Sequence, residues 1–80
     1  MEKKDVKLFV LDGCHTCESV ERVIKEEGVE CEIVNVTNND KLISQLIEAT
    51  HQMEMPILFI DDLVLCGHNI NIKELSGLLK

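Results

Sequence analysis

The chain has 80 residues, of which 45% are hydrophobic, and its 15 acidic and 8 basic residues give a formal net charge of −7. This size supports one domain over residues 1–80 and excludes a second core. The acidic balance, without a basic stripe, argues against a nucleic-acid partner. No stretch is long and apolar enough for a membrane span, and residues 1–5 lead into an apolar run without a signal-peptide core. We therefore expect a cytoplasmic monomer without a membrane partner.

The first half of the chain reads as a strand, a helix and a second strand. The apolar run at 6–11 predicts a strand buried on both faces, and residues 12–13 form a turn. Apolar positions at helical spacing over 17–27 predict a helix that Gly28 ends. Residues 31–36 are rich in β-branched side chains and predict a second strand. So short a strand–helix–strand unit indicates a right-handed crossover between parallel strands.

The second half predicts a helix, a hairpin and a last helix. Candidate N-caps at 37–40 precede apolar positions at helical spacing, which predict a helix to about Thr50. Pro56 opens a strand that turns at Asp61-Asp62 into another strand. A closing helix, capped by Asn69 or Asn71, places its apolar residues on an inner face: Ile72, Leu75, Leu78 and Leu79. The order βαβαββα predicts an α/β fold with a four-stranded mixed sheet and three helices packed on its two faces.

Two cysteines stand where the first strand turns into the first helix. Cys14 should lie at or near the helix cap, where free N–H groups and the positive end of the helix dipole favour a thiolate. Cys17 follows three residues later, on the same face and within disulfide reach. This arrangement is what a redox-active dithiol requires.

A dithiol at the first strand–helix turn, followed by a helix, a proline-led hairpin and a closing helix, resembles the thioredoxin superfamily. At this length the chain is most similar to a glutaredoxin or a glutaredoxin-like redoxin. The resemblance covers nearly the whole chain. It implies a thioredoxin-like fold and a dithiol–disulfide oxidoreductase that acts on protein disulfides without a cofactor. It also implies a cis bond before Pro56, which would lie against the dithiol, and pairing of the Met55 backbone with substrate as an added strand.

The chain departs from the glutaredoxin pattern at positions that meet glutathione. The usual Cys-Pro-Tyr-Cys is Cys14-His15-Thr16-Cys17, and residues 11–13 replace a basic residue often found ahead of it. The Thr-Val-Pro segment is Glu54-Met55-Pro56. The Gly-Gly-x-Asp segment, which holds the γ-glutamyl end of glutathione, is Cys66-Gly67-His68-Asn69. Only Gly67 matches there, and the final asparagine lacks the carboxylate that would meet an ammonium group. We therefore expect a protein reductase to be a better donor than glutathione.

The two cysteines are expected to have different roles. Cys14 is nearer the helix end and the surface, so it is the expected nucleophile, and Cys17 would resolve the mixed disulfide. A protonated His15 would stabilise the Cys14 thiolate, whereas the negative charges of Asp12 and Glu18 disfavour it. The sequence leaves this balance open, and His15 is equally well explained as an exposed loop residue.

The cysteines also admit other interpretations. A secreted disulfide framework, a structural disulfide and half of a zinc site are alternatives to redox chemistry. A metal or Fe–S carrier could use Cys14 and Cys17 with Cys66 and His68, but the second pair is unevenly spaced for zinc, so we expect no metal. A redox-inert module that keeps only the fold is a third alternative. Cys66, like Cys31, is most simply a small apolar residue.

Overall fold

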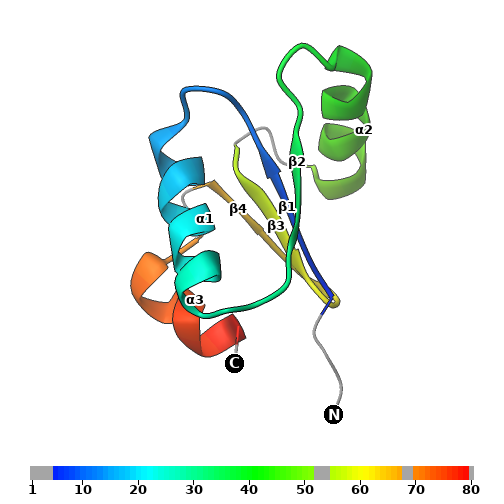
Figure 1. The fold of residues 1–80 in the computed structure, drawn as a ribbon. Coiled ribbons are helices and arrows are strands. Elements are labelled where there is room, and N and C mark those ends of the chain that lie inside the picture. Colours follow the sequence, from blue (N-terminus) through cyan, green and yellow to red (C-terminus); the bar gives the residue numbers. More distant parts are fainter. Residues whose placement is uncertain (1–4, 52–54, 68–69, 80) are drawn as a thin grey trace.

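The computed structural model describes residues 5–51, 55–67 and 70–79. Over these residues the chain forms a four-stranded sheet with three helices (Figure 1). In chain order the elements are β1 (Val6–Val10), α1 (His15–Glu26), β2 (Glu32–Asn35), α2 (Asp40–Thr50), β3 (Ile57–Ile60), β4 (Leu63–Cys66) and α3 (Ile72–Leu79). The predicted order of elements is confirmed. No helix in the described part of the chain is long and apolar enough to cross a membrane.

The sheet has the strand order β2-β1-β3-β4 and is mixed. β1 and β2 run parallel with α1 as the crossover between them, because parallel neighbours cannot be joined by a tight turn. β3 is antiparallel to both β1 and β4. α1 and α3 lie on one face of the sheet and α2 lies on the other (Figure 1). The predicted α/β fold, with helices on both faces of a mixed sheet, is confirmed.

β1 runs through the middle of the sheet and supplies side chains to both faces. Successive residues point in opposite directions, so Leu8 packs on the α1 and α3 side whereas Phe9 packs on the α2 side. The side under α1 and α3 holds residues at most 1% exposed: Leu8, Val20, Ile24, Leu58 and Leu75. The α2 side buries Phe9, Val36, Leu46, Ile57 and Cys66. A strand buried on both faces, as the apolar run predicts, is confirmed.

The helix ends follow local capping chemistry. α1 ends at Glu26, and Gly28 just beyond it has φ +68°, a left-handed conformation that glycine adopts readily. α2 begins after Asn39, whose side chain accepts a hydrogen bond from the Leu42 N–H at 3.1 Å. The sequence predicts both features, Gly28 at the end of the first helix and an N-cap among residues 37–40 for the second. β1 and β2 are each shorter than the apolar runs at 6–11 and 31–36, because residues at the ends of those runs leave the ladder.

The prediction for α3 is partly wrong. Leu75 and Leu79 are buried, at 0% and 4% exposed, but Ile72 and Leu78 are 37% and 38% exposed. A helix of eight residues presents one narrow stripe to the core, and positions four residues apart define it. Ile72 is the first residue of the helix and Leu78 lies on its flank. Asn71 is the cap, because its side chain accepts from the Lys73 N–H at 3.0 Å; the alternative, Asn69, lies outside the described residues.

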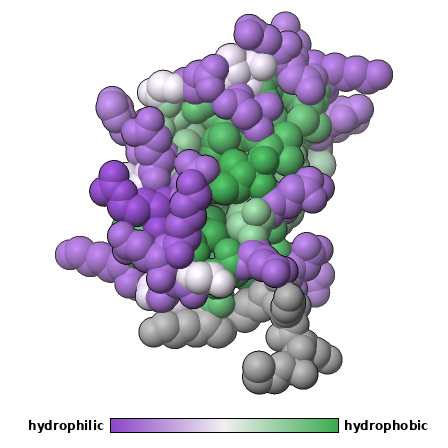
Figure 2. Space-filling model, in the orientation of Figure 1, coloured by the Kyte–Doolittle hydropathy of each residue, from purple (hydrophilic) through white to green (hydrophobic). Residues whose placement is uncertain are grey.

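β2 forms one edge of the sheet and lies on the face shown in Figure 2. Apolar side chains run down the middle of this face, between the hydrophilic surfaces over α1 and α2. Ile33 of β2 is 36% exposed. Its strand neighbour Glu32 is exposed and lies 3.5 Å from the Lys7 ammonium, measured from carboxylate oxygen to nitrogen. Charges beside an open strand edge oppose pairing with another strand.

Candidate active site

Cys14 lies where the chain turns from β1 into α1. Its backbone is extended, with φ −92° and ψ 108°, and it is the N-cap of the helix. Gly13, just before it, has φ +72°, which would strain most other residues. The Cys14 Sγ accepts a hydrogen bond from the Cys17 N–H at 3.1 Å, measured from N to S. The sulfur therefore takes the role of a capping oxygen, at a helix end where free N–H groups favour negative charge.

A disulfide joins Cys14 to Cys17, and their Cα atoms are 5.2 Å apart. The three-residue spacing predicts this pairing, and the separation is ordinary for a disulfide. The two sulfurs have different surroundings. Cys17 is 2% exposed and belongs to the core cluster under α1, whereas Cys14 is partly exposed and packs against that cluster. An approaching partner therefore meets the sulfur of Cys14 first.

The segment before β3 contains the predicted cis proline. The Met55–Pro56 peptide bond is cis, which confirms that expectation. Pro56 is buried and Met55 is partly exposed, in contact with the core clusters on both faces of the sheet. The Gly67 N–H donates to the Pro56 carbonyl at 2.8 Å, so the residue after β4 is fixed beside the residue before β3.

The topology brings this segment to the same end of the sheet as the dithiol. β1 ends there and β3 begins there, because Phe9 lies opposite Ile57 in the antiparallel register (Figure 1). Met55 and Cys14 pack against the same core cluster, on the α1 side. The structure thus brings the two cysteines to the same end of the sheet as Met55, Pro56 and Gly67, the residues that the family resemblance implies for substrate binding.

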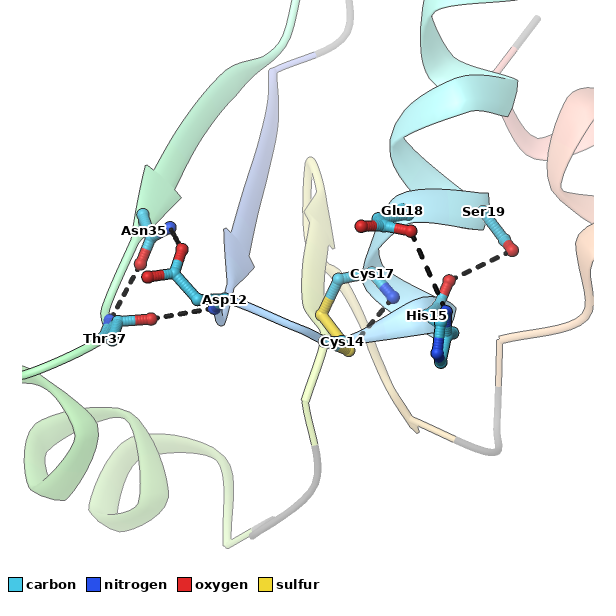
Figure 3. The surroundings of a disulfide bond; sticks show 8 residues. All are labelled: Asp12, Cys14, His15, Cys17, Glu18, Ser19, Asn35 and Thr37. Carbon is cyan, nitrogen blue, oxygen red and sulfur yellow. Dashed lines mark hydrogen bonds and ion pairs between the residues drawn. A yellow bond between two sulfur atoms is a disulfide. The ribbon is translucent and has the colours of Figure 1, made fainter.

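His15 and Glu18 lie together on the exposed side of the first turn of α1 (Figure 3). The His15 side chain is 98% exposed, and its Nδ1 is 3.9 Å from a carboxylate oxygen of Glu18. The His15 carbonyl accepts a hydrogen bond from the Ser19 hydroxyl at 3.1 Å. So exposed an imidazole is strongly solvated, and its effect on the thiolate is reduced by solvent screening.

Asp12, the other residue predicted to modulate the thiolate, faces away from it. Its carboxylate accepts a hydrogen bond from the Asn35 side-chain amide at 2.7 Å, and its backbone N–H donates to the Thr37 hydroxyl at 2.8 Å. Both partners follow or end β2, so Asp12 is turned toward that strand (Figure 3). The remaining predicted neighbours of the dithiol, Glu54, His68 and Asn69, lie outside the described residues.

The other two cysteines lie elsewhere. Cys66 is 3% exposed in the apolar cluster under α2, which fits its interpretation as a small apolar residue. Cys31 is partly buried just before β2, and burial raises the pKa of its thiol. Over residues 5–51, 55–67 and 70–79 the structure has no group of three or more His, Cys, Asp or Glu side chains arranged to hold a metal. His68 of the carrier alternative lies outside those ranges.

The Glutaredoxin family model matches residues 6–65, which is most of the chain. The chain belongs to the glutaredoxin family. Glutaredoxins are thiol–disulfide oxidoreductases, so this is the activity class of the protein. The matched segment includes Cys14, Cys17 and Pro56 but ends before Gly67, so it does not cover the segment that departs most from the glutathione-binding pattern.

Solved structures of redoxins have the same fold. The glutaredoxin-like NrdH-redoxin from Escherichia coli, described by its thioredoxin-like activity profile, is 18% identical over 92% of this chain and 93% of its own, with a TM-score of 0.75. A glutaredoxin from Archaeoglobus fulgidus is 20% identical over 96% of this chain and 87% of its own, with a TM-score of 0.78. A comparison with curated proteins found no match. At these identities the solved structures establish a shared fold.

Sequence reasoning missed Asn35 and Thr37, which hold Asp12 in place. The signal was present, because the carboxyl ends of neighbouring parallel strands meet at the same edge of a sheet. β1 and β2 are such a pair, so polar residues that end β2 should lie beside the turn that follows β1. Asn35 and Thr37 are those residues.

Proposed function

We propose that this glutaredoxin-family protein exchanges disulfides with protein partners through the Cys14-His15-Thr16-Cys17 motif. The observation that carries the proposal is the position of Cys14, whose sulfur caps α1 and is joined to a buried Cys17. A sulfur at a helix N-terminus is activated as a thiolate, and a second sulfur within reach completes a two-electron couple.

The reaction starts from the reduced dithiol. The Cys14 thiolate attacks one sulfur of a partner disulfide, forming a mixed disulfide and releasing the other partner sulfur as a thiolate that takes up a proton. Cys17 then loses its proton and attacks the Cys14 sulfur. The partner leaves as a dithiol, reduced by two electrons, and the Cys14–Cys17 disulfide remains. An external dithiol donor reduces this disulfide by the same two steps.

We propose that Met55, Pro56 and Gly67 form the binding surface beside Cys14. An extended protein segment would pair with the Met55 backbone as an added strand, which requires no particular side chain. The position of this segment at the dithiol end of the sheet supports the assignment, as does the Gly67 to Pro56 hydrogen bond that fixes its shape.

Glutathione should be a poorer partner than a protein dithiol system. It carries two carboxylates, and this chain has Asp12 two residues before Cys14 and Glu54 two residues before Pro56 in the sequence, together with a net charge of −7. Asn69 replaces the aspartate that would meet the ammonium group. A lost charge-assisted hydrogen bond is worth about 1.5–3 kcal/mol, enough to weaken binding by about tenfold or more.

The proposal needs no metal or organic cofactor, because the two sulfurs hold both electrons. We propose that the protein works as a monomer in the cytoplasm, where thiols are kept reduced. Its acidic charge disfavours nucleic acid and favours basic docking patches on protein partners.

Steady-state kinetics on a protein disulfide tests the proposal. One series uses glutathione with its reductase as donor, and the other uses a thioredoxin-reductase type of donor. We expect saturable turnover with the protein reductase and at least about tenfold lower kcat/KM with glutathione. Efficient, saturable turnover with glutathione would contradict the donor assignment, and no turnover with either donor would contradict the proposed function.

A further inference from the structure

A closed set of three hydrogen bonds ties the turn before the dithiol to the end of β2 (Figure 3). Asn35 donates from its amide nitrogen to the Asp12 carboxylate at 2.7 Å and accepts the Thr37 N–H on its amide oxygen at 2.9 Å. Thr37 in turn accepts the Asp12 N–H on its hydroxyl at 2.8 Å. Asn35 thus acts as donor and acceptor at once, which an aspartate or alanine at this position could not do.

These bonds fix where the Asp12 charge lies. Asp12 is only two residues before Cys14, yet its carboxylate points to Asn35 on β2, on the side away from the Cys14 sulfur (Figure 3). A cavity of about 280 Å³ lies beside Asp12 and reaches Cys17. Asp12 and Asn35 line this cavity together with two carboxylate residues of α1, Glu18 and Glu21.

A carboxylate that approached Cys14 would disfavour its thiolate, because like charges repel more strongly at shorter distance. Three other titratable groups of α1 lie in this region: His15 follows Cys14 in the chain, and Glu18 and Glu21 line the same cavity as Asp12. The side chains of His15 and Glu18 are 98% and 68% exposed, so solvent screens them. Met55, Pro56 and Gly67, on the opposite side, carry no charge. The position of the Asp12 carboxylate therefore decides how far its negative charge lies from Cys14.

We propose that Asn35 is a positioning residue for the dithiol, holding the Asp12 carboxylate away from the Cys14 sulfur and so keeping Cys14 reactive near neutral pH. This inference rests on the proposed role of Cys14 as the attacking thiolate. Asn35 does not touch the reacting atoms and acts through Asp12.

The test measures the alkylation rate of Cys14 by iodoacetamide against pH, in a Cys17→Ser background and with peptide mapping of the product. It needs no partner disulfide, so it is decided separately from the turnover experiment above. Asn35→Ala should raise the apparent pKa of Cys14 by roughly half a pH unit, which lowers the alkylation rate about threefold below that pKa.

Asp12→Asn supplies the matched control, because its amide oxygen can still accept the Asn35 hydrogen bond but carries no charge. In that background Asn35→Ala should leave the Cys14 pKa unchanged. An equal shift in both backgrounds would mean that the turn has merely loosened, and would overturn the proposal. So would an unchanged Cys14 pKa in the single variant.

A third variant keeps the test decisive if Asn35→Ala does not fold. The exchange Asp12→Asn with Asn35→Asp lets the new amide donate to the new carboxylate, which restores a hydrogen bond and places the charge on β2. We expect alkylation of Cys14 within about twofold of the parent. A pKa as high as that expected for Asn35→Ala would contradict the proposal.

Discussion

The two faces of the sheet each bury one cysteine, and the two are almost equally covered. Cys17 is 2% exposed under α1, and Cys66 is 3% exposed under α2. Their neighbours differ. Cys17 lies in the first turn of a helix and is bonded to a partly exposed Cys14, whereas Cys66 ends β4 in an apolar cluster. Burial alone therefore does not distinguish the proposed redox cysteine from Cys66. The bond to a second sulfur at a helix cap does.

The largest effect is expected from replacing Cys14, and Cys66 on the other face of the sheet supplies the matched substitution. Cys14→Ser removes the attacking sulfur, so we expect disulfide exchange to fall to the rate without protein. Cys66→Ala removes one sulfur atom from an apolar cluster, so we expect full activity and a loss of about 1 kcal/mol in the free energy of unfolding. The rate of reduction of a protein disulfide measures the activity, and urea unfolding measures the free energy of unfolding. Exchange that survives in the Cys14 variant would contradict its assignment as the attacking sulfur.

Cys17→Ser separates the roles proposed for the two bonded cysteines, because it leaves the attacking sulfur but removes the resolving one. The mixed disulfide between Cys14 and a partner can then no longer be released from within the protein. We expect it to accumulate as a covalent complex that a reducing agent cleaves. Non-reducing electrophoresis detects it, with Cys14→Ser as the control that should form none. Equal trapping on Cys31 or Cys66 would argue against Cys14 as the entry point.

Residues placed by local geometry could be predicted from the sequence, whereas residues placed by tertiary packing could not. The positions of Cys14 and Cys17 follow from the strand and helix periods, because local geometry decides where such residues lie. The cis bond before Pro56 is expected from the family resemblance. The exposure of Ile72 and Leu78 could not be predicted, because helical spacing indicates the inner face but not how narrow a stripe of it an eight-residue helix buries. The Asn35 contact needed the parallel pairing of β1 and β2, which joins residues far apart in the chain.

The stability of the core cluster that contains Cys17 can be tested on α3. Leu75 is fully buried on the α1 and α3 side, whereas Ile72 of the same helix is 37% exposed. We expect Leu75→Ala to lower the free energy of unfolding by about 2–5 kcal/mol and Ile72→Ala to lower it by about 1 kcal/mol or less. Urea unfolding measures both. Similar losses would mean that α3 buries a wider face than the structure has.

Cys31 is the intermediate case, partly buried on the α1 side and remote in sequence from the dithiol. Burial raises the pKa of its thiol, a hydrogen bond from the Leu8 backbone opposes that shift, and the charges of Glu21 and Glu32 add to it. A raised pKa favours the protonated thiol in the folded protein. This contribution to stability is therefore present below the ordinary thiol pKa of about 8.5 and is lost as the pH rises through the folded value.

We expect the alkylation of Cys31 in the oxidised protein, where the disulfide protects Cys14 and Cys17, to reach half its maximal rate at higher pH than in the urea-unfolded chain. Comparing midpoints separates ionisation from steric access, because hindrance lowers the rate at every pH without moving the midpoint. Glu21→Gln should bring the folded midpoint slightly down, since it removes one of the charges that raise the pKa. A folded midpoint at or below the unfolded one would show that Cys31 is more solvated than its position implies. It would then be a third thiol open to exchange, and the distinction between the dithiol and the other cysteines would have to rest on Cys66 alone.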